Sequence, residues 1–316
     1  MRKLLLFVTF AFLLGSCAKE NVALKTSSLG PNSETRSIND IFTLTKISIP
    51  NIPQETIYSD ASGNLYCGYK SSLSKYDATT GTWPILGTIN LTIPFPGGVS
   101  AIAVDNNGNW VAQAGNLGME KKTADLSSSV DFTSFFPFGS IFLGVCTAQN
   151  GNMFVSIASG DIVEVDDGFG NMMFKSCTKQ TVYRLNSNGV LALMAEIDEG
   201  INVFNYQAHN LLMKANGANI YGYTDSGYFK LNTNTKEVDY YAPSIPVTAY
   251  AAAINKANLY GVSGNKIVEL KPNGSYTVVA MIPSSIGNLN YSTCFAVNGD
   301  ATVFYIAAYD VYKLTL

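Results

Sequence analysis

The sequence predicts an all-β protein in which a unit of four short strands is repeated six times. A polar turn followed by a run of β-forming residues recurs along the chain, anchored at Asn64, Asn109, Asn152, Asn219, Asn258 and Thr302. Most of these anchors lie roughly forty residues apart, the length of one propeller blade. The last unit ends after its third strand, whereas residues 41–49 form a separate strand-like run before the first unit. We therefore predict a six-bladed β-propeller whose N-terminal strand closes the last blade and so removes open sheet edges.

Each unit contains the same elements in the same order. An apolar inner strand, such as residues 101–104 or 249–254, precedes the polar turn and the second strand. Third strands such as residues 182–185 and 267–270 then lead through an Asn- and Gly-containing turn to an outer strand. Gly and Asn suit these positions because they accept the positive φ of tight turns.

One interval is longer than the others. Between Asn152 and Asn219 the chain carries about 25 additional residues relative to a single blade, near 159–180. We interpret them as an inserted hairpin, because a degenerate seventh blade would need more residues than the interval contains.

Composition supports one folded domain. The chain has 316 residues, of which 47% are hydrophobic and 14% charged, with a net charge of −3 and a pI of about 5.2. Low charge argues against disorder, and the absence of a basic patch argues against nucleic acid as a partner. The predicted propeller domain covers residues 41–316.

The N-terminus has the features of an export signal. Arg2 and Lys3 precede an apolar run over residues 4–14, which is too short to span a bilayer. The following Leu-Gly-Ser-Cys resembles the lipobox of bacterial lipoproteins. The resemblance implies a signal peptide over residues 1–16, acylation of Cys17 with chains such as palmitate, and a flexible tether over residues 17–40.

These features imply an outer-membrane lipoprotein of the cell envelope, either periplasmic or displayed on the surface. Lys19 and Glu20 form a short version of the pattern that accompanies surface display. The alternative is an ordinary cleaved signal that happens to be followed by a cysteine.

The remaining cysteines are Cys67, Cys146, Cys177 and Cys294. Export permits a disulfide, but three of the four lie in apolar strand-like runs, so we expect buried free thiols. Their spacing does not match a zinc site.

Residues 97–109, with the sequence GGVSAIAVDNNGN, resemble the NHL repeat and the related senescence-marker/gluconolactonase propellers. The match is good in this unit and looser elsewhere. The resemblance implies a propeller but leaves function open, because propellers carry many unrelated activities. In the gluconolactonase family, Glu, Asn and Asp side chains facing the channel hold a divalent cation.

A ligand site is expected where the inner strands begin, at the mouth of the central channel. Acidic, amide and aromatic side chains at this mouth would suit a sugar or a peptide. The candidate ligand-binding residues are Glu55, Ser100, His209, Asn210, Tyr250 and Tyr291. The alternative is that they are ordinary loop residues around a water-filled channel.

Catalysis is not favoured by the residues. Glu55 and Asn210 are residue types that a lactonase cation site would use. The fifth and sixth blades would also need an Asp, but the corresponding residues are Ala249, Tyr250 and Thr293. A hard cation that is held by too few oxygen ligands binds poorly. His209 is the single histidine, and no Gly-x-Ser-x-Gly motif accompanies it. We therefore expect no metal, no cofactor and no catalytic residues.

Two further segments have open interpretations. Asp105 begins a sequence like a calcium loop, but Asn116 stands where the bidentate Glu belongs, so a hairpin turn explains it better. The phenylalanines Phe132, Phe135, Phe136 and Phe138 either pack into the core or form an exposed patch for a partner.

The resulting hypothesis is a non-enzymatic binding or scaffold propeller on the cell envelope, with a glycan or an envelope protein as its partner. The alternatives are a metal-dependent lactonase or hydrolase that uses the channel mouth, and a purely structural subunit.

Overall fold

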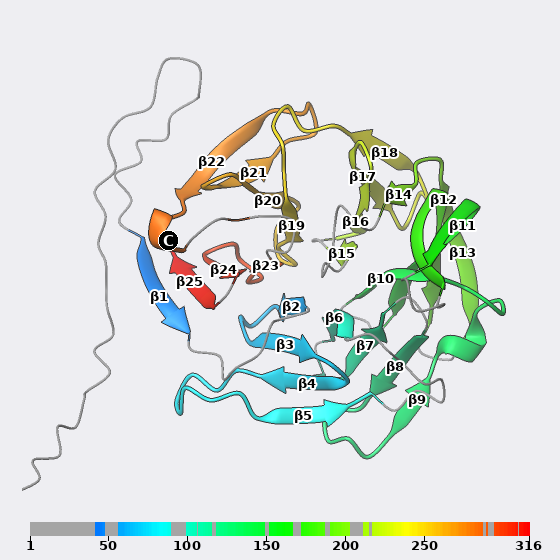
Figure 1. Ribbon diagram of the computed structural model, residues 1–316, viewed down its shortest axis with the longest axis horizontal. Coiled ribbons are helices and arrows are strands. Elements are labelled where there is room, and N and C mark those ends of the chain that lie inside the picture. Colours follow the sequence, from blue (N-terminus) through cyan, green and yellow to red (C-terminus); the bar gives the residue numbers. More distant parts are fainter. Residues whose placement is uncertain are drawn as a thin grey trace, which may run out of the picture.

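The computed structural model describes residues 42–47, 56–89, 99–105, 107–115, 118–148, 152–166, 172–186, 190–202, 211–214, 217–286, 289, 294–308 and 310–316. These residues form six antiparallel sheets arranged as blades around a central axis (Figure 1). The predicted six-bladed propeller is therefore confirmed.

The first three blades follow one another along the chain, each running from an inner to an outer strand. Their strands are β2 (Thr56–Ser59), β3 (Leu65–Tyr69), β4 (Ser72–Lys75) and β5 (Ile85–Thr88) in blade one; β6 (Val99–Val104), β7 (Trp110–Ala114), β8 (Gly118–Lys122) and β9 (Ser129–Asp131) in blade two; and β10 (Phe142–Thr147), β11 (Met153–Asp166), β12 (Met172–Leu185) and β13 (Leu191–Ile197) in blade three. A short strand, β14 (Ile201–Asn202), adds to β12.

The remaining blades repeat this order until the last outer strand, which comes from the other end of the chain. Their strands are β15 (Leu212–Lys214), β16 (Asn219–Thr224), β17 (Gly227–Asn232) and β18 (Val238–Tyr241) in blade four; β19 (Ala249–Ala252), β20 (Leu259–Ser263), β21 (Lys266–Leu270) and β22 (Tyr276–Met281) in blade five; and β23 (Cys294–Val297), β24 (Val303–Ala307), β25 (Val311–Thr315) and β1 (Thr43–Ile47) in blade six. Among the described residues, the single 3-10 turns η1 (Thr133–Phe135) and η3 (Ser284–Ile286) lie between blades.

Strand β1 closes the ring as predicted. It pairs antiparallel with β25, from Thr43 opposite Thr315 to Ile47 opposite Val311. Leu44 and Ile47 are buried, because β1 packs its apolar side chains into the clusters at the edges of blade six. Closure therefore combines backbone pairing with burial of apolar surface.

The recurring polar turns are held by their own side chains. The carboxylate of Asp105 accepts hydrogen bonds from the backbone N–H groups of Asn107 and Asn109 and from the Asn109 side chain. Asp60 binds Asn64 in the same way one blade earlier. These contacts confirm that the Asp105 segment is a hairpin turn.

The core lies mainly between neighbouring blades, in several apolar clusters. The four cysteines of the propeller are free and buried, as expected. Burial raises the pKa of the Cys146 and Cys294 thiols to about 12, because the thiolate would lose its hydration.

The two ends of the channel are surrounded by different loops: one by those that lead into the inner strands, the other by the turns that follow the inner strands. We call the end where the six inner strands begin the entry face, and the opposite end, which carries the Asp60 and Asp105 turns, the exit face. Within the described ranges there is no helix with the length and apolar character needed to cross a membrane.

Candidate functional site

The inner strands enclose a narrow cavity along the channel. Its volume is about 60 Å³, and its lining comes from five of the six inner strands and the residue Ile254. A water molecule needs roughly 10–15 Å³ on this measure. The described cavity therefore has room for a few waters, and a sugar or peptide would have to bind at a mouth of the channel rather than inside it.

Polar groups gather toward the exit end of this cavity. The hydroxyls of Ser59 and Thr147 are buried and have no hydrogen-bond partner among the described residues. Lys214 also lines the cavity, and its ammonium group donates to the carbonyl oxygens of Gly217 and Asn219. Burial lowers the pKa of Lys214 because the charged form is desolvated. This end of the channel suits water or a small polar solute.

Most of the predicted site residues lie outside the described residues. These are Glu55, His209, Asn210 and Tyr291, together with the predicted lipidation site Cys17.

The two remaining candidates have structural contacts. Ser100 lies at the entry end of β6, where its hydroxyl donates to the carbonyl oxygen of Gly115 at 2.7 Å. Tyr250 lines the channel cavity but is buried. Its backbone N–H donates to the hydroxyl of Tyr223 at 2.7 Å, and the two rings lie edge to face at 4.7 Å. The structure thus brings Tyr250 to the channel and does not bring Ser100 into its lining.

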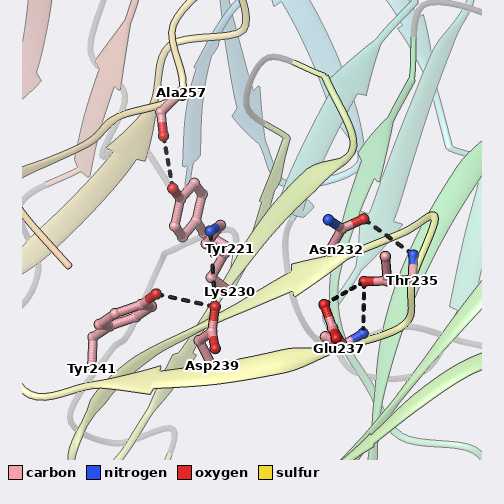
Figure 2. Close-up of polar contacts among 8 residues, drawn as sticks. All are labelled: Tyr221, Lys230, Asn232, Thr235, Glu237, Asp239, Tyr241 and Ala257. Atoms are coloured by element: carbon pink, nitrogen blue, oxygen red, sulfur yellow. Dashed lines mark hydrogen bonds and ion pairs between the residues drawn. The ribbon is translucent and has the colours of Figure 1, made fainter.

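Tyr250 belongs to a cluster of tyrosines between blades four and five. The Tyr228 ring stacks on that of Tyr241, with 5.1 Å between the ring centroids, and its centroid lies 5.8 Å from that of Tyr250. At the outer edge of the cluster, the Tyr241 hydroxyl donates to Asp239, which also lies 3.8 Å from the Lys230 ammonium (Figure 2). The cluster packs two blades together, so its rings contribute to the core more than to an open surface.

The inserted segment is a tall extension of blade three. Strands β11 and β12 are 14 residues each and remain paired from Met153 opposite Leu185 to Asp166 opposite Met172. The neighbouring inner strand β10 begins at Phe142, opposite Ile157. The later part of β11 therefore continues beyond the start of β10 and rises from the entry face. The predicted hairpin is present as a direct continuation of the second and third strands.

The base of this extension is braced by the next blade. β14 pairs with Ser176 and Cys177 of β12, and the backbone N–H of Asn202 donates to the carboxylate of Asp225 at 2.7 Å. Phe174 and Cys177 are buried. These contacts hold the lower part of the hairpin in a fixed orientation above the entry face.

The upper part of the hairpin is exposed. Ile162 and Val163 are 44% and 45% exposed. Beyond Ala158, the edge of β11 that faces away from β12 has no paired strand among the described residues. A bulge between Ser159 and Ile162, with Gly160 at a φ of +71°, changes the direction of the strand here.

A second exposed apolar segment lies at the foot of the hairpin. Phe132 and Phe136 are buried, whereas Phe135 is 40% exposed and Phe138 is fully exposed. This loop leads into β10 on the entry face, and its last residue, Ile141, accepts a hydrogen bond from Ala158 of β11 at 2.9 Å. The four phenylalanines therefore divide between core packing and an exposed patch.

A larger cavity lies on the other side of the ring, between blades one and six. Its volume is about 470 Å³, and Lys75 and Tyr76 from blade one and Tyr305 and Lys313 from blade six contribute to its lining. Sequence reasoning did not identify it, because its walls come from opposite ends of the chain.

Metal ligands do not cluster in the described part of the chain. There, no three His, Cys, Asp or Glu side chains lie close enough together to hold a metal ion. The two residues that a lactonase site would use, Glu55 and Asn210, are outside that part.

Comparisons with known proteins identify the architecture. No family model matches the sequence, and no curated protein matches it significantly. Among solved structures, the chain is similar to a gluconolactonase from Xanthomonas campestris, with 12% identity, a TM-score of 0.59, and coverage of 87% of this chain and 90% of that chain. It is also similar to a virginiamycin B lyase from Staphylococcus aureus, with 13% identity, a TM-score of 0.52, and coverage of 87% and 99%.

At these identities the likeness establishes the fold alone. The chain is a six-bladed β-propeller with the architecture of the gluconolactonase-like propellers. Within this chain, the tall hairpin of blade three departs from the four-strand pattern of the blades.

Proposed function

We propose that this chain is a non-catalytic binding module of the bacterial cell envelope, anchored by lipid on Cys17, that holds an envelope protein on the entry face of blade three. The observation that carries the proposal is the exposed edge of β11 on a braced hairpin. An unpaired strand edge offers backbone N–H and C=O groups to an extended segment of a partner.

Exposed apolar side chains support a protein partner over a glycan. Ile162 and Val163 on the hairpin and Phe135 and Phe138 in the loop before β10 are exposed, and both segments lie at the entry face. Exposed apolar residues gathered on one face are typical of protein contact surfaces, whereas the described channel is too small to admit a sugar ring. Asp161, Glu164 and Asp166 lie on the same strand, and their charges favour a partner with basic residues.

The test is site-specific photocrosslinking in intact cells. A photoreactive residue at Val163 or at Phe138 is expected to capture the same envelope protein. The matched control is Ile85, an exposed apolar residue of blade one, which should not capture it. Replacing residues 165–173 by Asn-Gly shortens the exposed edge of β11 but keeps Val163 and Phe174, and it should weaken the crosslink at Val163. Equal capture at Ile85, or no capture at Val163, would overturn the proposal.

A lactonase is the second candidate, because the chain shares its fold with a gluconolactonase. Purified protein should be assayed for lactone hydrolysis with added Ca²⁺ or Zn²⁺. A binding module predicts no turnover above the buffer rate. Metal-dependent turnover that Glu55→Gln removes would replace the binding proposal with the enzymatic one.

A further inference from the structure

We infer that the cavity between blades one and six is a binding site for a small anionic sugar, such as a uronate, and that its ligand joins the two blades. The cavity of about 470 Å³ lies within the volume range of small-molecule sites, roughly 300–1,000 Å³. It is separate from the entry face of blade three.

Charge in the lining favours an anion. Lys75 of β4 and Lys313 of β25 both line the cavity. Neither forms an ion pair within the described part of the chain, where the ion pairs involve other lysines. The Lys75 ammonium instead lies 5.7 Å from the centroid of the Tyr66 ring. Two cations that share a cavity without a carboxylate partner are suited to an anionic ligand.

One carboxylate, that of Asp77, also lines the cavity. Its oxygens accept hydrogen bonds from the backbone N–H of Thr79 and the hydroxyl of Thr80, both at 2.8 Å. Asp77 therefore stabilises its own turn, and the lining residues carry a net charge of +1, from two lysines and one aspartate.

Aromatic and apolar groups complete the lining and favour a ring over a bare ion. Tyr76 and Tyr305 line the cavity together with Leu65, Leu86 and Pro84. Tyr76 packs against Trp83 at a centroid distance of 5.1 Å, which holds its ring in place. The carbon face of a sugar ring packs on aromatic side chains, while its carboxylate pairs with lysine.

The position of the site gives ligand binding a structural consequence. Lys75 and Lys313 come from the first and last blades, which meet only when the ring closes, with β1 paired to β25 and both blades packed in one apolar cluster. A ligand that contacts both blades binds the closed ring and not the open chain, so it raises the free energy of unfolding by RT ln(1 + [L]/Kd), where [L] is the free ligand concentration.

The experiment measures the melting temperature and the Trp83 fluorescence of the lipid-free propeller, titrated with D-glucuronate at constant ionic strength. We expect the melting temperature to rise with the logarithm of the glucuronate concentration once that concentration exceeds Kd. We also expect a saturable change in Trp83 emission, and Trp83→Phe should remove this change. Glucose, which lacks the charge, and acetate, which lacks the ring, should each produce a much smaller effect.

Matched variants assign the effect to the cavity. Lys75→Gln and Lys313→Gln should each weaken glucuronate binding about tenfold, the cost of losing one charge-assisted contact. Lys256→Gln, an exposed lysine of blade five, should leave it unchanged. No saturable response to glucuronate, an equal response to acetate or glucose, or equal weakening by Lys256→Gln would overturn the inference. These results are independent of whether the hairpin of blade three binds a protein.

Discussion

The hydroxyl of Tyr305 donates to the carbonyl oxygen of Gly63 at 3.1 Å, and so joins the last blade to the first across 242 positions of sequence. Tyr221 makes the equivalent contact between blades four and five, where its hydroxyl donates to the carbonyl oxygen of Ala257 at 2.7 Å (Figure 2). Each tyrosine is the third residue of the second strand of its blade. The contact is therefore a repeated device that ties a blade to the first turn of the next.

Removing this hydroxyl at the closure seam should weaken the ring. Tyr305→Phe is expected to lower the free energy of unfolding by about 1 kcal/mol, the net value of a typical hydrogen bond. Tyr221→Phe should have a similar effect, because its contact is equivalent. Urea unfolding followed by circular dichroism measures both values. A change at Tyr221 with none at Tyr305 would show that the closure seam does not depend on this contact.

Removing β1 should open the propeller. A chain that starts at residue 41 retains Phe42, Leu44 and Ile47, whereas one that starts at residue 48 loses all three buried side chains. Each contributes about 1.5–3 kcal/mol of apolar burial, and β25 would become an unpaired edge. We expect the shorter chain to melt at a lower temperature and to aggregate, as measured by thermal circular dichroism and light scattering. Equal melting of the two chains would contradict closure by β1.

Alkaline pH should destabilise the fold through its buried thiols. Burial raises the pKa of Cys146 and Cys294 to about 12, above the ordinary thiol value. Above about pH 8.5, where an unperturbed thiol ionises, the unfolded chain loses these protons while the folded chain keeps them. Stability is thus fully present below that pH and falls as pH rises toward 12.

The same burial protects the thiols from reagents. Ellman's reagent at pH 8 should label none of the four propeller cysteines in the native protein and all of them in guanidinium chloride. A Cys146→Ser, Cys294→Ser variant should show a smaller alkaline loss of stability. Rapid labelling of the native protein would show that the blades open readily.

The Tyr223 hydroxyl should be important for stability because it accepts the backbone N–H of Tyr250 in a buried setting. Tyr223→Phe removes that acceptor, and we expect a loss of about 1–3 kcal/mol. Tyr241→Phe is the control, since its hydroxyl bonds the exposed side chain of Asp239 and should contribute much less (Figure 2). Denaturant unfolding compares the two; equal losses would contradict a specific role for Tyr223.

Local sequence signals were sufficient to predict the blades. The turn at Asp105 is encoded within a few residues, because its carboxylate binds Asn107 and Asn109 directly. Closure could be predicted because the last unit lacks an outer strand while residues 41–49 have no blade of their own. The hairpin insertion could be predicted from the length of the interval between Asn152 and Asn219. The sequence did not indicate that the insertion would extend β11 and β12 themselves, with a bulge near Gly160.

Contacts between blades could not be predicted in the same way. The position of Tyr250 near the channel followed from counting along its blade, but its burial depends on Tyr223 and Tyr228 of the preceding blade. The cavity between blades one and six was missed because Lys75 and Lys313 come to line the same cavity only after the ring closes. A single unaligned sequence contains no direct record of such pairings.

The pairing of Thr43 with Thr315 also brings the two ends of the propeller domain together, which makes a circular permutation of the chain feasible. Because the first and last strands of the ring lie side by side, a short Gly/Ser linker could connect residue 316 to residue 42. The chain could then be cut at the exposed Thr79–Gly81 turn instead. Such a circular permutant would begin inside blade one and keep every sheet pairing, with the closing role passing from β1 to a strand of that blade.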